Sequence, residues 1–435
     1  MFTKILIANR GEIAVRIIRA CREMGIETVV VYSEADAESL PVAMADERIC
    51  IGGNSPKDSY LNMENIISAA LVTKAQAIHP GYGFLSENPE FAKKCDENGI
   101  VFIGPPWDVI KLMGDKEKAR ELMSEIGVPI VPGSGVITSI EEAEAEADRI
   151  GYPVMIKASA GGGGKGIRVV FRKEELAESI RVASEEARSG FGNADVFMEK
   201  YLVGVRHIEV QVLADKFGNI VCLGERDCSL QRNKQKVIEE TPSPFLSDEL
   251  RERLMETAKK AMKFSYYENA GTVEFLVDKE GNFYFIEMNT RLQVEHPITE
   301  ELTGIDIVKW QIRIACEMKL NFTQEDVQFK GHVIECRINA RSTGNLNFIH
   351  IPGGKGVRCD TAMISGMEVV PYYDSMLGKL IARSLTREET VRKMESALCE
   401  MIIDGVETNQ ESQIDLIRSQ LFYSGMYDTR SLEDR

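Results

Sequence analysis

The sequence predicts a protein of mixed α/β and α+β class, with an N-terminal doubly wound parallel sheet, a small inserted lid and a mixed C-terminal domain. Three observations support this prediction. The first 33 residues alternate strand, helix and strand; near residue 130 the texture changes to strands separated by a glycine run; and antiparallel-type strands dominate from residue 204 onward. At 435 residues, the chain is also too long for one ordinary core.

The N-terminal prediction rests on hydrophobic periodicity. Residues 4–8 (KILIA) are typical of a buried strand, residues 12–24 repeat apolar side chains near helical spacing, and residues 27–33 (ETVVVYS) form a second strand. This order favours a small parallel sheet covered by helices. The first turn, ANRGEI, holds only one glycine, so the dinucleotide fingerprint is absent and NAD binding is disfavoured.

The remaining chain divides by its pattern of strands. We expect an N-terminal domain at 1–114, a connecting helix at 115–130, a lid with an acidic helix (140–150) at 131–203, and a C-terminal domain at 204–435. The last contains HIEVQVLAD, NIVCLGERD, TVEFLVD and FYFIEMN as predicted strands, and a helix at 386–402.

Composition disfavours several classes of function. A formal net charge of −16 argues against non-specific nucleic-acid binding, because the chain as a whole does not neutralise phosphates. No apolar run approaches the ~18 residues that span a bilayer, so no membrane association is expected. The N-terminus lacks a signal peptide's apolar core, and the nine cysteines include no Cys-x-x-Cys pair, which predicts a cytoplasmic protein.

A glycine-rich run, residues 159–166 (SAGGGGKG), lies between two predicted strands. It differs from a P-loop, because Gly166 stands where a hydroxyl would hold magnesium and a strand follows instead of a helix. Taken alone, the run fits a flap that covers phosphates and a merely flexible hairpin equally well. Lys157 ends the preceding strand, where a cation would meet a nucleotide, whereas Lys116 by itself is typical of a solvated helix start.

The most informative stretch, residues 272–296, begins with a predicted hairpin. A four-residue turn at 279–282 pairs Asp278 with Phe283 and places Glu274 opposite Glu287. Directly opposed residues have Cβ atoms ~4.5–5.5 Å apart, where like charges are destabilising. The two carboxylates therefore predict a counter-cation, and their oxygen ligands favour Mg²⁺.

Beyond the hairpin, polar residues occupy every second position: Glu287, Asn289, Arg291, Gln293 and Glu295. If the segment stays extended, these side chains share one face. A solvent-exposed face is the usual explanation of such alternation. Opposed glutamates that lead to arginine, glutamine and glutamate favour a functional site instead.

Other positions carry weaker signals. Lys234 and Lys236 lie in a charge run, which is usually solvated. They become candidate site residues only in combination with the carboxylates. Arg337 lies between apolar residues of a predicted strand, where a guanidinium normally needs a partner or an anion. His79 and Cys228 are interpreted as structural residues.

Together these motifs resemble one enzyme family. The matching segments are ANRGEIA (8–14), HPGYGFLSEN (79–88), MGDK (113–116), IKASAGGGGKG (156–166), MEKYL (198–202), ERDCS with the following QR and QK (225–236), EMNTRLQVEHP (287–297), ECRINA (335–340) and PYYDSM (371–376). They are similar to the biotin carboxylase branch of the ATP-grasp enzymes over nearly the whole chain. RLQVEHP and HPGYGFLSEN are specific to that branch, whereas other ATP-grasp ligases share the glycine flap.

The resemblance implies a pre-ATP-grasp N-terminal domain, an ATP-grasp lid and a larger C-terminal domain. It also implies that the chain binds ATP together with Mg²⁺ or Mn²⁺. The residues expected to bind ATP are Lys116, Lys157, Gly163, Gly164, Glu199, Lys200, Leu202, His207, Gln231 and Leu276. Those expected to hold the metal ion are Glu274, Glu287 and Asn289.

The reaction implied by the resemblance is carboxylation of biotin with bicarbonate. The residues expected around bicarbonate are Lys236, Arg291, Gln293 and Val294. Glu295 would deprotonate bicarbonate for attack on the γ-phosphate of ATP, which gives carboxyphosphate. Tyr82 would lie along the biotin ring, and Arg337 would stabilise the biotin enolate formed when phosphate takes the N1 proton.

Two features depart from the family pattern. Position 234 is lysine where many members have histidine near the ribose, which puts one nucleoside contact in doubt. After Ala340 the chain continues with Arg341 and reaches the sequence NFIHIPGG several residues earlier than usual. Either this loop is naturally short or the given sequence lacks residues there.

The resemblance also implies partners. We expect biotin to arrive on a separate biotin carboxyl carrier protein, because the chain lacks a Met-Lys-Met turn, and carboxyltransferase subunits to complete an acetyl-CoA carboxylase of fatty acid biosynthesis. A homodimer is expected, through the first helix (Arg16, Arg19, Glu23) and the strand at 355–358. The alternatives are a component of pyruvate or another acyl-CoA carboxylase, a different ATP-grasp ligase, or a degenerate regulatory subunit.

Overall fold

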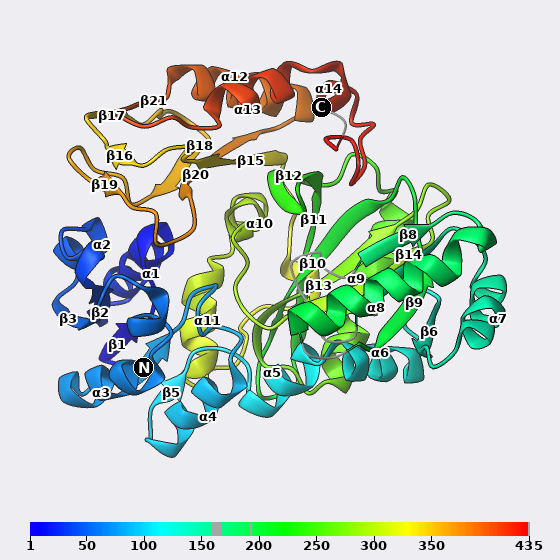
Figure 1. Ribbon diagram of the computed structural model, residues 1–435. Coiled ribbons are helices and arrows are strands. Elements are labelled where there is room, and N and C mark those ends of the chain that lie inside the picture. Colours follow the sequence, from blue (N-terminus) through cyan, green and yellow to red (C-terminus); the bar gives the residue numbers. More distant parts are fainter. Residues whose placement is uncertain (159–166, 192–193, 434–435) are drawn as a thin grey trace. The chain divides into compact units, whose positions relative to one another are not determined.

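The computed structural model describes residues 1–158, 167–191 and 194–433. The chain forms two units, each with a hydrophobic core of its own (Figure 1). The first contains Met1–Val128, Arg206–Leu276 and Glu287–Arg435. The second contains Pro129–Val205 together with Val277–Ile286, the tip of a long hairpin.

The first unit begins with a five-stranded parallel sheet in the order β3-β2-β1-β4-β5. Its strands are β1 (Lys4–Ile7), β2 (Glu27–Ser33), β3 (Glu47–Gly52), β4 (Ala77–His79) and β5 (Val101–Phe102). Its helices are α1 (Gly11–Glu23), α2 (Leu40–Met44), α3 (Met63–Thr73), α4 (Pro89–Glu97), α5 (Trp107–Gly114) and α6 (Lys116–Glu125). The chain runs outward to β3 and then returns past β1 to β4, which confirms the predicted doubly wound sheet.

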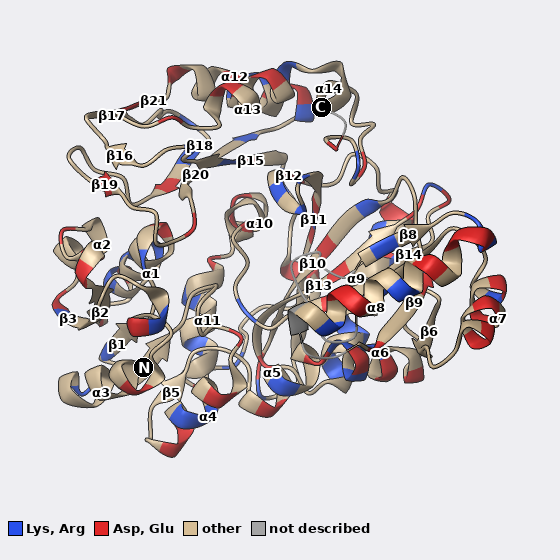
Figure 2. Cartoon of the chain, viewed as in Figure 1, with Lys and Arg blue, Asp and Glu red and all other residues tan. Residues whose placement is uncertain are grey.

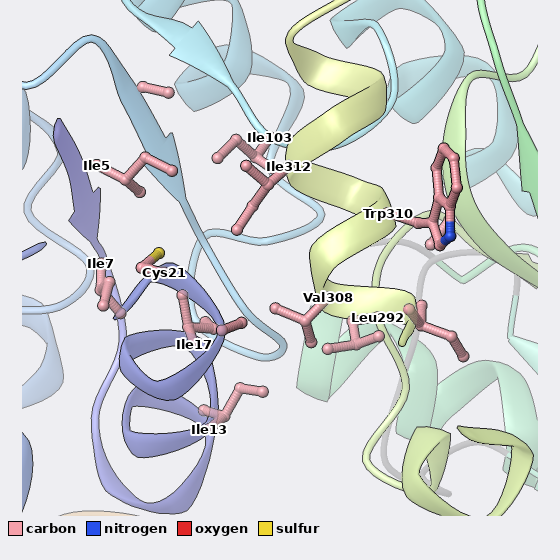
Figure 3. Packing of buried hydrophobic residues seen from close by; sticks show 14 of the residues in the cluster. Ile5, Ile7, Ile13, Ile17, Cys21, Ile103, Leu292, Val308, Trp310 and Ile312 are labelled. Atoms are coloured by element: carbon pink, nitrogen blue, oxygen red, sulfur yellow. The ribbon is translucent and has the colours of Figure 1, made fainter. Parts of the chain in front are cut away.

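Alternation along β1 and helical spacing along α1 build the core beside this sheet (Figure 3). Ile5 and Ile7 lie two residues apart on the strand, and Ile13 and Ile17 lie four residues apart on the helix, so each pair faces one way. Ile312 of α11 (Ile307–Ala315) joins the same cluster. All five side chains are at most 2% exposed.

The rest of the first unit is organised around an eight-stranded sheet in the order β14-β13-β10-β11-β12-β15-β20-β18. Its strands are β10 (Arg206–Ala214), β11 (Ile220–Arg232), β12 (Gln235–Thr241), β13 (Asn269–Val277), β14 (Phe283–Asn289), β15 (His332–Asn339), β18 (Val357–Thr361) and β20 (Met376–Ser384). The accompanying helices are α9 (Asp248–Phe264), α10 (His296–Thr303), α11, α12 (Arg387–Glu400), α13 (Gln410–Arg418) and α14 (Gln420–Ser424). Short strands pair as β16 (Gly344–Asn345) with β19 (Glu368–Val369), and β17 (Phe348–His350) with β21 (Ile402–Asp404).

Strands β12, β15 and β20 separate a hydrophobic face from a charged one. Ile238 and Cys336 belong to a core formed with α12 and α13, which lie along one side of these strands (Figure 1). Successive side chains of a strand point to opposite faces. The next positions along the three strands, Glu239, Arg337 and Lys379, therefore project together from the other face.

In its described residues, the second unit is a four-stranded sheet with two α-helices. Its order is β6-β9-β7-β8, and its elements are β6 (Gly133–Val136), α7 (Ile140–Ile150), β7 (Val154–Ala158), β8 (Ile167–Val170), α8 (Leu176–Phe191) and β9 (Val196–Lys200). β7 pairs antiparallel with β8, so a strand follows the glycine run, as predicted. Acidic residues dominate α7, whereas α8 carries residues of both signs (Figure 2).

The turn between β13 and β14 is shorter than predicted. The Asp278 N–H donates to the Asn282 carbonyl over 2.9 Å, so Asp278 pairs with Asn282 and not with Phe283. Two further bonds favour this turn, because the Asp278 carboxylate accepts from the N–H groups of Glu280 and Asn282. Gly281 supplies the left-handed conformation, with φ at 81°. The predicted four-residue turn is therefore wrong, and so is the pairing of Asp278 with Phe283 from which the strand register was counted.

The polar segment that follows the hairpin is not an extended strand. β14 ends at Asn289, and α10 begins at His296 with Pro297 in its first turn, a position that favours a helix start. Arg291, Gln293 and Glu295 thus lie in the connection and at the helix N-cap. The prediction that these residues share one strand face is wrong beyond Asn289.

Both residues interpreted as structural are fully buried. Burial raises the pKa of the Cys228 thiol well above its ordinary value, which disfavours a thiolate nucleophile. Burial lowers the pKa of His79 to about 3, and its Nδ1 accepts the Gly81 N–H over 3.1 Å. No helix in the described part of the chain is long and apolar enough to cross a membrane.

Truncating the α1 core should destabilise the first unit. We expect Ile17→Ala to lower the free energy of unfolding by about 2–5 kcal/mol, because it leaves a cavity in a fully packed cluster. Urea denaturation followed by fluorescence measures this loss. Leu71→Ala, a truncation on α3 at a residue that is 51% exposed, is the control and should change the free energy by about 0.5 kcal/mol or less. Equal losses for the two variants would contradict the packing described for α1.

Candidate active site

Lys236 lies at the centre of a cluster of buried carboxylates. From β12, its Nζ contacts Glu209 of β10 at 2.6 Å, Glu295 at the N-cap of α10 at 2.5 Å and Glu274 of β13 at 3.4 Å. None of the three carboxylate side chains is more than 6% exposed, and the lysine side chain is 13% exposed. A buried carboxylate normally requires a paired cation, so this ammonium holds three strands and a helix start in one arrangement.

Glu295 is bound by cations on both oxygens. Its Oε1 contacts Lys236, and its Oε2 accepts from the Arg337 guanidinium at 3.1 Å. Burial alone would raise the pKa of this carboxyl, but Lys236 and Arg337 hold the pKa well below its ordinary value. Glu295 is therefore ionised and is aimed into the site.

Arg337 is enclosed by acidic groups of the charged sheet face. It contacts Glu239 of β12, with Nε donating over 2.6 Å, in addition to Glu295. Glu335 of β15 lies directly opposite Glu239 in the strand register, and both glutamates are 0% exposed. Burial raises the pKa of Glu239 to about 7 and raises that of Glu335 well above its ordinary value. Two opposed buried carboxyls avoid mutual repulsion when one of them carries a proton.

A second guanidinium organises the connection before α10. Arg291 donates to Asn289 Oδ1 at 2.9 Å and to Gln293 Oε1 at 2.8 Å, and its Nε donates to Glu87 at 2.8 Å. Gln293 in turn donates to Glu274 over 2.9 Å. The predicted residues of the polar segment therefore meet in space, although they do not share a strand face.

The residues predicted to hold a metal ion lie at the edge of this cluster. Glu274 accepts from Asn289 Nδ2 at 2.7 Å and contacts His207 Nε2 at 2.7 Å. Glu287, which is half-buried, pairs with Lys116 at the start of α6 over 3.0 Å. Among the described residues, the side-chain groups whose donor atoms lie close enough for one ion are His207 with Glu209 and Glu274, and Glu209 with Cys228 and Glu295. The set Glu274, Glu287 and Asn289 stays a prediction.

The predicted nucleoside contacts of the first unit surround His207. Gln231 lies 2.8 Å from the His207 Nδ1, on the ring side opposite Glu274. Burial by itself lowers the His207 pKa, but the Glu274 charge and hydrogen bond raise it above its ordinary value. Leu276, which is half-buried, is on the same face of β13 as Glu274, two residues away. Lys234 is exposed in the β11–β12 turn.

The second unit carries the other predicted ATP ligands. Lys157 of β7 pairs with Glu199 of β9, and Glu199 is 5% exposed. Lys200 donates to the carbonyls of Gly151 and Tyr152, each at 2.9 Å, and Leu202 follows the end of β9. Gly163 and Gly164 lie outside the described residues.

Tyr82 and Arg337 are both half-buried. The half-buried Tyr82 donates its hydroxyl to Glu12 of α1. Lys236 and Arg337 line a cavity of about 450 Å³ whose wall also includes Asn339, Ser375 and residues of α13. A cavity lined by two half-buried cations can accept a small polar or anionic group.

Sequence reasoning missed five residues that hold this site together: Glu12, Glu87, Glu209, Glu239 and Lys379. Four of them have an apolar neighbour in a strand or helix, and Glu87 lies between Ser86 and Asn88 in a loop. Such a residue gives the same sequence pattern on a solvated face as in a buried pair. Glu209 offered the clearest signal, because it lies between Ile208 and Val210 in a strand and requires a partner if buried.

Known families match most of this chain. Residues 1–110 match the biotin carboxylase N-terminal domain, residues 115–323 match the carbamoyl-phosphate synthase L chain ATP binding domain, and residues 335–434 match the biotin carboxylase C-terminal domain. The chain belongs to the biotin carboxylase family.

Individual relatives agree with this assignment over the full length. Biotin carboxylase 1 of Bacillus subtilis is 54% identical, over 100% of this chain and 98% of the relative. The 2-oxoglutarate carboxylase small subunit of Hydrogenobacter thermophilus is 51% identical, over 100% of this chain and 94% of the relative. The solved biotin carboxylase domain dimer of that carboxylase, in complex with MgADP, ADP and bicarbonate, matches with a TM-score of 0.94 at 51% identity and covers 100% of this chain and 98% of that one.

The family assignment confirms the predicted fold and enzyme class. The chain is an ATP-grasp enzyme with biotin carboxylase domains at both ends. The acidic cluster around Lys236 lies within the ATP binding match, and Arg337 lies within the C-terminal match.

The opposed pair Glu239 and Glu335 should make the free energy of unfolding decrease as pH rises. An unfolded glutamate ionises near pH 4.3, whereas folded Glu335 keeps its proton to higher pH, so the folded state binds more protons and loses stability as pH rises between these two pKa values. We expect Glu335→Gln to lose less unfolding free energy between pH 5 and pH 8 than the unchanged chain does, as measured by urea denaturation at each pH. Glu249→Gln, at an exposed position of α9, is the matched control and should keep the original slope. A Glu335→Gln slope equal to that of the control would show that Glu335 ionises normally.

Proposed function

We propose that this chain catalyses the ATP- and bicarbonate-dependent carboxylation of biotin through carboxyphosphate, with Glu295 as the base. The observation that carries this proposal is the double contact of Glu295. One oxygen faces Lys236 and the other faces Arg337, so a single carboxylate lies between two cations that can each receive an anion. This arrangement suits a reaction in which an anionic substrate is activated and a second anion develops beside it.

Bicarbonate would bind between Lys236, Arg291 and Gln293, with Val294 beside it. A carboxylate held by two cations is a weak base, because its pKa is low. An incoming bicarbonate changes this balance, since it recruits Lys236 and places a negative charge next to Glu295. Both effects raise the pKa of Glu295 toward the working pH. The substrate thereby converts Glu295 into the base that accepts its proton, and the resulting carbonate attacks the γ-phosphate of ATP.

The oxygen ligands near Glu274 fit a magnesium ion. Two carboxylates and one amide oxygen, from Glu274, Glu287 and Asn289, are hard donors of the kind that Mg²⁺ prefers. Lys116 and Lys236 compensate these carboxylates, each by a direct contact. A bound ion would neutralise charge on the phosphates of ATP. Arg291, which donates to Asn289, would orient that ligand.

The ATP itself would be bound by side chains from several strands. Lys116 would approach the phosphates, and His207, Gln231 and Leu276 would lie near the nucleoside. Lys157, Glu199, Lys200 and Leu202 are the candidates from the second unit, together with Gly163 and Gly164. A flap that excludes water would protect carboxyphosphate from hydrolysis.

Biotin would enter the cavity lined by Lys236 and Arg337. Carboxyphosphate breaks its C–O bond to give CO₂ and phosphate, and phosphate removes the N1 proton of biotin. Negative charge then develops on the ureido oxygen, where the Arg337 guanidinium would stabilise it. Tyr82 would lie along the ring and limit its orientation. The enolate nitrogen attacks CO₂, which yields carboxybiotin.

We further propose that biotin arrives on a separate carrier protein and that the carboxyl group passes to acetyl-CoA through carboxyltransferase subunits. A homodimer would place Arg19 and Glu23 of α1 near a second copy. Arg16 makes its ion pairs within its own chain, because it is 8% exposed and contacts Glu300 and Asp306 at 2.8 and 2.7 Å. Arg358 pairs with Glu300 as well, whereas Arg19 and Lys355 are exposed.

Replacing the base should remove turnover while nucleotide binding survives. We expect Glu295→Gln to lower biotin-dependent ATP cleavage by about 100-fold or more, as for the loss of a general base, with the ATP dissociation constant nearly unchanged. The measurement is ADP release with biotin, in the presence and absence of bicarbonate, beside fluorescence titration of ATP. An unchanged chain that cleaves ATP without any response to biotin would reject the proposed function. Near-normal turnover by Glu295→Gln would reject only the role of this residue.

The two metal carboxylates should act through one ion. We expect Glu274→Gln and Glu287→Gln each to raise the Mg²⁺ concentration needed for half-maximal ATP cleavage, and the double variant to lose less than the sum of the single losses. Titration of Mg²⁺ at fixed ATP measures this dependence. Glu280→Gln, in the exposed turn of the same hairpin, is the control and should behave like the unchanged chain. Fully additive losses would mean that the carboxylates hold separate groups.

A further inference from the structure

Lys379 of β20 is a fully buried lysine on the charged face of the sheet. Its side chain is 0% exposed, and it lies directly opposite Arg337 on one side and Asp360 on the other. Lysine is almost never buried to this degree unless it is paired, and two opposed cations in neighbouring strands repel each other. Because burying Lys379 opposite Arg337 is unfavourable for stability, we infer that this lysine has a role in the site.

The first contact of Lys379 is with the connection that precedes α10. Its Nζ donates to the Val294 carbonyl over 2.8 Å. Val294 lies between Gln293 and Glu295, so this bond fixes the peptide that joins two residues of the site. The α10 N-cap conformation of Glu295 depends on the same stretch of backbone.

The second contact of Lys379 reaches Tyr82 through Glu12. Lys379 Nζ lies 3.0 Å from Glu12 Oε1, and the same oxygen accepts the Tyr82 hydroxyl. The ammonium also lies 5.7 Å from the centre of the Tyr82 ring. Among the described residues, Glu12 Oε2 has no hydrogen-bond partner, so Glu12 acts through one oxygen that joins Lys379 to Tyr82.

We propose that Lys379 is a positioning residue that fixes both walls of the site: the Val294–Glu295 peptide directly, and the Tyr82 side chain through Glu12. The proposal rests on the proposed function, in which Glu295 is the base and Tyr82 contacts biotin. One rigid ammonium then sets the distance between the base and the ring that orients biotin. A displacement of about 1 Å between reacting groups is enough to lower a rate by about 100-fold.

Loss of the ammonium should change kinetic constants more than it changes the fold. We expect Lys379→Met to lower kcat and to raise the KM for biotin, each by about 10-fold to 100-fold, as for loss of a hydrogen bond to a charged group. The dissociation constant of ATP should stay within about twofold, because the Lys379 contacts described above involve none of the predicted nucleotide residues. Lys393→Met is the matched control, since Lys393 also donates to two backbone carbonyls, those of Lys355 and Arg383, in the same unit.

A second variant separates the two contacts and guards against misfolding. Lys379→Met leaves the Glu12 carboxylate buried without its cation, so Lys379→Met with Glu12→Gln removes that charge. Glutamine can still accept the Tyr82 hydroxyl. We expect the KM for biotin of this double variant to return most of the way to that of the unchanged chain. Its kcat should stay low, because only the Val294 contact is then missing. Tyr82→Phe should add less than twofold to the KM of Lys379→Met if both changes act on one wall.

Hydrogen–deuterium exchange gives a readout that does not need turnover. We expect amides of residues 291–296 to exchange at least about tenfold faster in the double variant than in Lys393→Met. Kinetic constants within twofold of the unchanged chain, or exchange equal to that of the control, would overturn the positioning role. If the unchanged chain lacks biotin-dependent ATP cleavage but the exchange difference is present, the proposed function fails and the Lys379 contact stands.

Discussion

The Lys236 ammonium is the interaction on which the rest of the site depends. Three buried carboxylates converge on one Nζ atom, and none of them would tolerate burial as an isolated charge. Arg226, which is 0% exposed, supplies a second cation to Glu209, and Arg337 supplies a second cation to Glu295. The cluster is nearly neutral as a whole. It can therefore accept anions only by exchanging internal pairs for pairs with substrate, which ties binding to a change in the charge state of Glu295.

The strand that carries Lys236 is braced from both of its faces. Glu239 faces the site and holds Arg337, whereas Glu240, the next residue, faces the other way and accepts Arg387 at 2.7 Å and the Tyr427 hydroxyl. Arg206 stacks on Tyr427 at 4.0 Å and pairs with Asp227 at 3.0 Å. Through these contacts the C-terminal segment helps set the position of β12. Residues far from the chemistry therefore contribute to the geometry around Lys236.

The sequence predicted the parts of this protein that follow local rules. The first two parallel strands, β10, β14 and α7 follow from periodicity, and the structure places them within one or two residues of the expected bounds. β11 instead runs to Arg232, five residues past the expected end, and β13 begins at Asn269, three residues before the expected start. The family motifs led to the prediction of Glu295, Arg337 and Lys236 as site residues, and the structure brings these three side chains into contact. Glu12, Glu239 and Lys379 were missed for a physical reason. A charged residue in a strand or helix looks the same in sequence whether water or a buried partner satisfies it, and its partner here is 98 to 367 residues away.

The polar segment from Glu287 to Glu295 shows that predicted site residues can meet in space although the predicted backbone is wrong. An extended strand was expected to align its odd positions, but the strand ends at Asn289 and Pro297 starts a helix. The same side chains still converge, because Arg291 bonds both neighbours at a spacing of two residues. The alternation of polar residues therefore predicts which side chains contact one another, but it does not predict the backbone conformation. Charge pairing at short spacing is possible both in a strand and in a tight connection. Lys236 of β12 and Arg337 of β15 favour the tight connection, because it places Glu295 against both cations in a buried position.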